Sequence, residues 1–115
     1  GTVLRIVRDT KLAHDIKALY NHKCQVCDFA IPTKNGFYSE GAHIKPLGKP
    51  HNGDDSLANL ICLCPNHHVM FDKGSFSISD NYELLGAESG QLAVHTQHKI
   101  DKENLNYHRG SHGYN

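Results

Sequence analysis

Two pairs of metal-binding side chains, each spaced by two residues, constrain the fold of this chain more than any other feature. Cys24 and Cys27 form the first pair, and Cys64 and His67 form the second. Three thiolates and one imidazole make a complete tetrahedral ligand set for Zn²⁺, with no position left for a substrate. The sequence therefore predicts a structural zinc site that joins two segments separated by residues 28–63.

Disulfide bonds are the alternative use of the four cysteines. Their spacing beside histidine favours zinc, and no secretory signal or membrane-spanning run is visible, which predicts a cytoplasmic protein. Cys62 lies outside the ligand set. Because the run around it is expected to be extended, its side chain should be a small buried core residue and not a fifth ligand. A register in which Cys62 replaces Cys64 competes with this prediction, but it would lose the two-residue spacing to His67.

The size and charge of the chain limit its class. At 115 residues it is expected to be one domain, 1–115, to whose stability a structural metal would contribute materially. Twelve basic and twelve acidic side chains cancel, so bulk charge does not predict nucleic-acid binding. Such binding would need a local patch or another part of a longer protein, of which we expect this chain to be a fragment. The basic residues expected to contact phosphates, without sequence preference, include Arg5, Arg8, Lys45 and Lys49.

The apolar pattern predicts an α+β domain. Thr10 can cap a first helix, Asn35-Gly36 is a strong turn signal before a strand, and Pro65 suits the first turn of a second helix. A polar loop rich in glycine and proline is expected up to about residue 55. The expected elements are a helix over 10–20, a strand over 37–44, a strand over 60–63, and a helix from Pro65 to Phe71 or Asp72.

The pattern is weaker beyond the second helix. A hairpin is expected over 76–78 and 82–85, followed by a strand over 92–95. Residues 101–108 suit a last helical turn or two. Residues 110–115 are expected to be frayed.

A second group of polar residues is interleaved with the zinc ligands: His43, Asn59 and His68. Hydrolysis of a phosphodiester needs a base for water, a cation that stabilises the developing charge, and a scaffold that holds both at one phosphate. His43 ends the first predicted strand as a candidate base, and His68 lies in the first turn of the next helix as a candidate ligand of a divalent ion. The amide of Asn59 would tie the loop back and orient the base.

The residues around these positions resemble the HNH endonucleases of the ββα-metal type, many of which carry a structural zinc. The resemblance is close over 24–73, the expected core of the domain. It implies a ββα-metal (HNH) nuclease fold with a zinc knuckle, an N-terminal helix and an extra C-terminal hairpin. The segments that carry it are Ala42-His43-Ile44-Lys45-Pro46, Gly53-Asp54, Asn59-Leu60 and Leu63-Cys64-Pro65-Asn66-His67-His68.

The same resemblance implies a metal-dependent endonuclease that hydrolyses DNA. By it, His43 matches the general base, Asn59 the central asparagine, and His68 the histidine that binds a catalytic Mg²⁺ or Mn²⁺. The main alternative is a non-catalytic, zinc-stabilised nucleic-acid-binding module in which His43 and His68 only pack. Such a module needs no spare histidine beside His67, so the His67-His68 pair favours the enzyme. A zinc deaminase is a weaker alternative, since its motif is absent.

A longer stretch is similar to the HNH modules of modification-dependent restriction enzymes. It takes in 6–10, 48–53, 71–74 and 106–109. In those enzymes the nuclease is fused to a separate reader of modified bases, such as an SRA or EVE domain, and no reader is visible in this sequence. The resemblance implies double-stranded DNA as the partner. Since one site addresses one phosphodiester at a time, cutting both strands would need a homodimer or two sequential nicks.

One position departs from the family pattern. Family members often carry Asp or His immediately before the base histidine as the second metal ligand, and this chain has Ala42 there. Glu40 would project to the same side as Ala42, whereas Asp72 lies one helical turn after His68. We favour Glu40 over Asp72 as the second ligand. Ligation by His68, waters and the substrate phosphate alone also stays open, because Mg²⁺ keeps much of its water shell.

Overall fold

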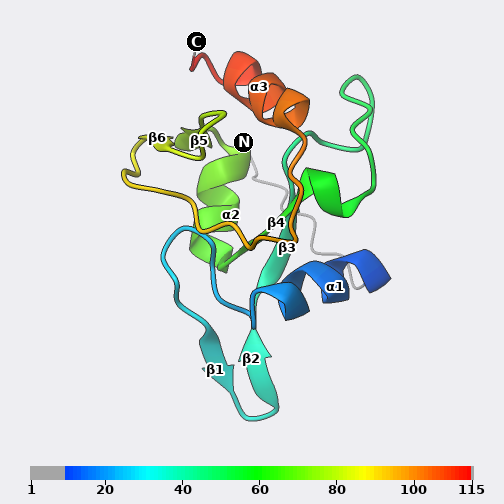
Figure 1. The fold of residues 1–115 in the computed structure, drawn as a ribbon, viewed down its shortest axis with the longest axis vertical. Coiled ribbons are helices and arrows are strands. Elements are labelled where there is room, and N and C mark those ends of the chain that lie inside the picture. The colour runs from blue at the N-terminus through cyan, green and yellow to red at the C-terminus, as the bar shows by residue number, and fades with distance from the viewer. Residues whose placement is uncertain (1–9, 115) are drawn as a thin grey trace.

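The computed structural model describes residues 10–114, so Arg5, Arg8 and the segment 6–9 lie outside the described residues. Within 10–114 the strands form three separate antiparallel pairs, β1–β2, β3–β4 and β5–β6 (Figure 1). No helix in this range is long and apolar enough to cross a membrane. The elements are α1 (Lys11–Leu19), β1 (Ile31–Thr33), β2 (Gly36–Tyr38), β3 (Glu40–His43), the 3₁₀ turn η1 (Leu57–Asn59), β4 (Leu60–Leu63), α2 (Pro65–Asp72), β5 (Phe76–Ile78), β6 (Leu84–Gly86) and α3 (Lys102–Ser111).

The central β3–β4 hairpin carries one helix on each face. On one face, Ala42 pairs with Ile61, and both side chains join the main hydrophobic core with Phe71 of α2. On the other face, Gly41 pairs with Cys62 and lies under α1, where a Cβ atom on Gly41 would stand 3.3 Å from Ile16 Cγ2. Because side chains alternate along a strand, β3 presents odd and even residues to different helices.

Both helices around this hairpin form where the sequence predicts them. The Thr10 hydroxyl accepts a hydrogen bond from the Ala13 amide at 3.2 Å and caps α1. Pro65 occupies the first turn of α2, where its missing N–H group costs no hydrogen bond. The β5–β6 hairpin also forms, which confirms the prediction of an extra C-terminal hairpin.

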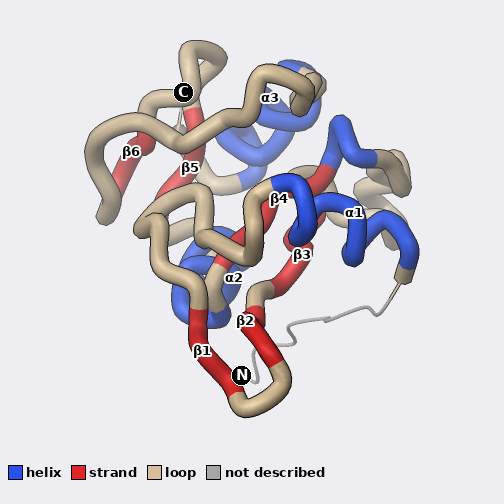
Figure 2. The backbone as a smooth tube through the Cα atoms, turned by 60° about the horizontal axis from the view of Figure 1, so that its bottom comes forward, coloured by secondary structure: helices blue, strands red, loops and turns tan. Residues whose placement is uncertain are grey.

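The prediction of one continuous strand over 37–44 is wrong, because the chain changes its pairing strand at Ser39. Residues 36–38 form β2 and pair with β1, whereas β3 begins at Glu40 and pairs with β4. Ser39 is buried, and its hydroxyl lies 2.9 Å from His22 Nδ1, which holds the chain at the change of direction. The β1–β2 hairpin therefore projects from the body of the domain, as Figures 1 and 2 both show.

The strand expected over 92–95 does not form. Only an isolated bridge between Glu83 and Gln91 occurs next to it, and residues 92–100 instead form an irregular connection to α3, with a turn at 96–97 (Figure 1). Gln25 holds this connection, because its backbone oxygen accepts from the Ala93 amide at 2.9 Å and its side chain donates to Ala93 O at 2.7 Å. The backbone N–H and C=O groups of Ala93, which a neighbouring strand would otherwise pair, are instead hydrogen-bonded to Gln25 in the turn beside Cys24.

The C-terminus is more ordered than the sequence suggests. α3 runs to Ser111, and the Tyr114 hydroxyl donates to Gly74 O at 2.7 Å, so residues 110–114 are not frayed. His108 anchors the helix: its ring stacks on Phe71 with the centroids 3.7 Å apart. His108 Nε2 lies 2.9 Å from Phe71 O, and Nδ1 lies 2.7 Å from the Ser77 hydroxyl. These contacts satisfy a neutral imidazole, and burial lowers the pKa of His108 to about 4.

The stability of the domain should therefore fall in mild acid. The unfolded chain protonates His108 near pH 6.5, whereas the folded chain resists protonation down to about pH 4. The stabilisation is present in full above about pH 6.5 and is lost as the pH falls towards 4, by at most about 3 kcal/mol. Urea unfolding between pH 7 and pH 5 measures it, with His108→Gln as the control that cannot titrate. Equal pH slopes for the two proteins would contradict this assignment.

Candidate functional site

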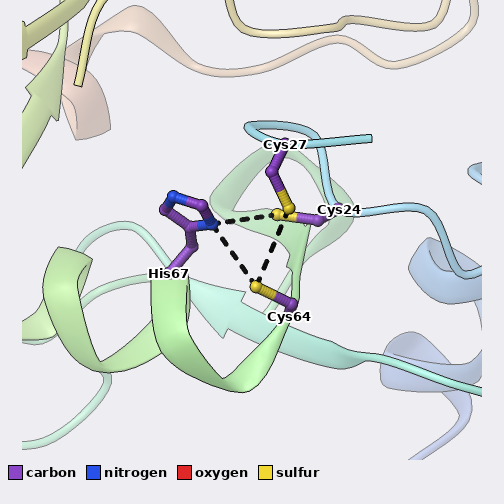
Figure 3. Close-up of side chains that lie close together, drawn as sticks. All are labelled: Cys24, Cys27, Cys64 and His67. Carbon is purple, nitrogen blue, oxygen red and sulfur yellow. Dashed lines mark hydrogen bonds between the residues drawn. The ribbon is translucent and has the colours of Figure 1, made fainter. Parts of the chain in front are cut away.

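Three cysteines and one histidine converge where α2 begins (Figure 3). One ligand atom from each of Cys24, Cys27, Cys64 and His67 lies within 4.8 Å of all the others. His67 Nδ1 is 3.3 Å from Cys64 Sγ and 3.7 Å from Cys24 Sγ, and the sulfur atoms of Cys27 and Cys64 are 4.0 Å apart. A tetrahedral ion with bonds of about 2.3 Å needs ligand atoms about 3.8 Å apart, so this group fits one metal ion.

All four cysteines of the chain are free, which agrees with the metal interpretation and not with disulfides. Burial raises the pKa of the Cys24 thiol to about 12, so a metal-free protein would keep this side chain protonated. A bound cation would favour the thiolate instead and so release a proton. Cys62 is fully buried beside Ile16 and Leu60, which confirms its predicted role as a core side chain.

A carboxylate supports the histidine of this group from outside. Glu88 Oε1 lies 2.8 Å from His67 Nε2, the ring nitrogen that faces away from the sulfur atoms. Such a contact fixes the tautomer and the ring orientation of a metal-binding histidine. Sequence reasoning missed Glu88, because it lies 21 residues from His67 in a loop with no recognisable motif.

His68 lies between two carboxylates. It is buried, with Nδ1 2.9 Å from Glu40 Oε1 and Nε2 3.3 Å from Asp72 Oδ2. The Glu40 side chain is 0% exposed, whereas the Asp72 side chain is 32% exposed. The two residues that the sequence offers as rival ligands therefore lie at opposite nitrogens of one imidazole, and of the two carboxylates only that of Asp72 is partly exposed to solvent.

His43 belongs to a separate hydrogen-bonded group. Its Nε2 atom lies 3.1 Å from Asp55 Oδ1, and its side chain is 18% exposed. An imidazole that is paired with a carboxylate and accessible to water suits proton transfer. Asp55 is a second residue that the sequence did not single out, although it follows the Gly53-Asp54 segment of the polar loop.

Asn59 holds the loop that follows His43. It is fully buried, its Oδ1 accepts from the Lys45 amide at 2.9 Å, and its Nδ2 donates at 2.8 Å to both Lys45 O and Asp54 O. The expectation that Asn59 ties the loop back is confirmed. The structure gives it backbone partners rather than the imidazole of His43, so any orienting effect on that ring passes through the loop.

The two histidines belong to different hydrogen-bonded groups. Glu40 and Ala42 face α2, where His68 lies, whereas His43 pairs with Leu60 on the face of α1. The groups are joined through β3, which supplies a member of each. A β-hairpin followed by a helix, with a Cys₃His cluster where the helix begins, is the ββα-metal architecture of the HNH nucleases.

Comparison with known proteins agrees with this class. Residues 24–79 match the family model described as HNH endonuclease. A solved structure titled "Modification dependent TagI restriction endonuclease" superposes with a TM-score of 0.86 and 42% sequence identity, over 90% of this chain and 38% of that chain. No curated protein matches the chain significantly. Residues 24–79 are therefore a region of the HNH endonuclease type, and the chain spans about 38% of the length of the restriction endonuclease that it resembles.

Proposed function

We propose that this chain is the DNA-cleaving module of a modification-dependent restriction enzyme. The observation that carries the proposal is His68, buried between Glu40 and Asp72 one residue after the histidine of the Cys₃His cluster. A domain stabilised only by the cluster has no need to bury a second imidazole together with the Glu40 carboxylate, because burial of such groups costs free energy. The likeness to a modification-dependent restriction endonuclease supports the same function.

Zn²⁺ is the proposed occupant of the Cys₃His cluster. Thiolates and imidazole are its preferred ligands, and four protein ligands leave no open position, which is typical of a structural ion. The ion would join the turn at Cys24 and Cys27 to the first turn of α2, which also carries His68. In this way the cluster would fix the helix that presents the second histidine group.

We propose Asp72 rather than Glu40 as the residue that shares a divalent ion with His68. If Nδ1–H donates to the buried Glu40 carboxylate, the lone pair of Nε2 is directed towards Asp72. Glu40 then orients the imidazole, and Asp72 adds an oxygen ligand that is partly open to solvent. Mg²⁺ or Mn²⁺ bound there would supply charge stabilisation for the phosphorane and the leaving oxygen.

His43 is the proposed general base. If its Nε2–H donates to Asp55, Nδ1 is left with a lone pair that can accept a proton from water. The Asp55 carboxylate would stabilise the imidazolium that results. Asn59 would keep the loop from Lys45 to Asp54 in place around this pair, as its three hydrogen bonds to the loop backbone suggest.

The proposed substrate is double-stranded DNA, with modified bases recognised by a separate domain. Lys45 and Lys49 lie on the loop after His43 and could contact phosphates. A homodimer or two sequential nicks would cut both strands. Conversion of supercoiled to open-circular plasmid by the zinc-loaded chain, with and without Mg²⁺ or Mn²⁺, tests the proposal. Absence of nicking in every divalent ion, with zinc retained, would favour the non-catalytic binding module.

The ligand role of Asp72 leads to a specific expectation. Asp72→Asn should weaken Mn²⁺ binding at least about tenfold, because it removes one of two protein ligands. Excess Mn²⁺ should restore part of the nicking rate. Titration calorimetry with Mn²⁺ measures the affinity, and Asp15→Asn, an exposed carboxylate paired with Lys11, is the matched control. Unchanged affinity in Asp72→Asn would return the ligand role to Glu40.

A further inference from the structure

The projecting β1–β2 hairpin touches the second histidine group through one hydroxyl. Tyr38, the last residue of β2, donates from its hydroxyl to Glu40 Oε2 at 2.6 Å. The other oxygen of the same carboxylate, Oε1, lies 2.9 Å from His68 Nδ1. A chain of side chains therefore runs from the hairpin through Glu40 and His68 to Asp72.

The Glu40 carboxylate is costly to bury without donors on both oxygens. Its side chain is 0% exposed, and a buried carboxylate is stable only when it is paired and hydrogen-bonded. The Tyr38 hydroxyl and the His68 ring occupy different oxygens, so together they restrict rotation of the carboxylate plane. The orientation of that plane in turn restricts the His68 ring, because the Nδ1 contact depends on it.

Tyr38 is poorly placed for a role in core packing. Tyr38 is 40% exposed, and its neighbour Phe37 is 58% exposed. The whole of β2 is exposed, and no residue of the hairpin belongs to the buried part of either hydrophobic cluster. The hydroxyl contact with Glu40 is thus the feature of Tyr38 that bears most directly on the buried site.

We infer that Tyr38 is a positioning residue of the proposed divalent-ion site, acting through Glu40 on the imidazole of His68. The inference rests on the proposed function, since it assumes that His68 binds the ion. It assigns the β1–β2 hairpin a part in the site although the hairpin contributes no ligand. Removal of the hydroxyl should loosen the Glu40 carboxylate and, with it, the His68 ring.

Binding of Mn²⁺ to the zinc-loaded chain tests the inference without cleavage. Tyr38→Phe keeps the ring and removes only the hydroxyl, and it should weaken Mn²⁺ binding about tenfold, the lower end of the loss expected when a partner that orients a metal ligand is removed. Tyr20→Phe is the matched control, because its hydroxyl is also hydrogen-bonded, to His98, but lies on the α1 side. The control should bind Mn²⁺ like the parent, and zinc content and thermal unfolding verify the fold of each variant.

A double-mutant cycle with Glu40→Gln separates positioning from a general effect on structure. If Tyr38 acts through Glu40, then Tyr38→Phe should change Mn²⁺ affinity little in the Glu40→Gln background. Additive effects, or a Tyr38→Phe affinity equal to that of the parent, would overturn the inference. If the parent binds Mn²⁺ and nicks plasmid in those cases, the proposed function survives. A parent that binds no Mn²⁺ overturns the inference and the proposed divalent-ion site together.

Discussion

Cys27→Ser should release the proposed structural Zn²⁺ and unfold most of the domain. Structural Zn²⁺ binds zinc-finger peptides with apparent free energies of about 10–16 kcal/mol, which is as large as the whole stability of a typical domain. Cys27 suits the test because its side chain is exposed, so the substitution removes a ligand without leaving a cavity in the core. Loss of the cooperative thermal transition, followed by circular dichroism, and loss of zinc, measured by elemental analysis, are the expected results.

Cys62→Ala provides the control for this variant. It also removes a thiol, but from the core beneath α1, and should therefore retain one zinc ion per chain while losing some stability. Absence of zinc from the native protein would contradict the assignment of the Cys₃His cluster as a structural zinc site. So would a metal-free Cys27→Ser variant that keeps its tertiary structure.

His43→Ala should lower the rate of plasmid nicking by about 10²–10⁴-fold, the usual contribution of a general base. The variant should keep its fold and its zinc, because His43 is partly exposed and its side chain is bonded to Asp55, also exposed. It should also keep its Mn²⁺ affinity, since His43 and His68 belong to separate hydrogen-bonded groups. Initial nicking rates at saturating Mn²⁺ measure the loss.

His14→Ala is the matched control, because His14 is an exposed histidine of α1 outside both groups. It should cut as fast as the parent. Should His43→Ala also cut as fast as the parent with zinc retained, His43 is not the base. A parallel loss of Mn²⁺ affinity in His43→Ala would instead place His43 in the divalent-ion site.

The local features of this domain follow from the sequence. Two-residue spacing within Cys24–Cys27 and Cys64–His67 brings each pair into one turn, whatever the rest of the chain does. The cap at Thr10 and the proline at the start of α2 likewise act within a single helical turn. These signals depend on neighbours along the chain, and the resemblance to HNH endonucleases joins them into one fold.

The contacts between distant segments could not be predicted, because they depend on packing. The sequence offers Glu40 and Asp72 as rivals, and only the fold of α2 against β3 places them on opposite nitrogens of His68. The break of the expected strand at Ser39 likewise depends on its burial beside His22. Residues four apart on a helix have a fixed geometry, whereas partners 28 residues apart, such as Glu40 and His68, meet only after the chain has folded.

The spacing and capping signals in the sequence were thus sufficient to predict the Cys₃His cluster, the helices around the central hairpin and the residue types available for hydrolysis. The grouping of those residues depends on the tertiary fold, which places Asp55 beside His43, Glu88 beside His67, and Tyr38 beside Glu40. The physical reason is that ligand spacing and helix capping are short-range properties of the chain. The orientation of a buried side chain is set by whichever distant donor or acceptor satisfies it.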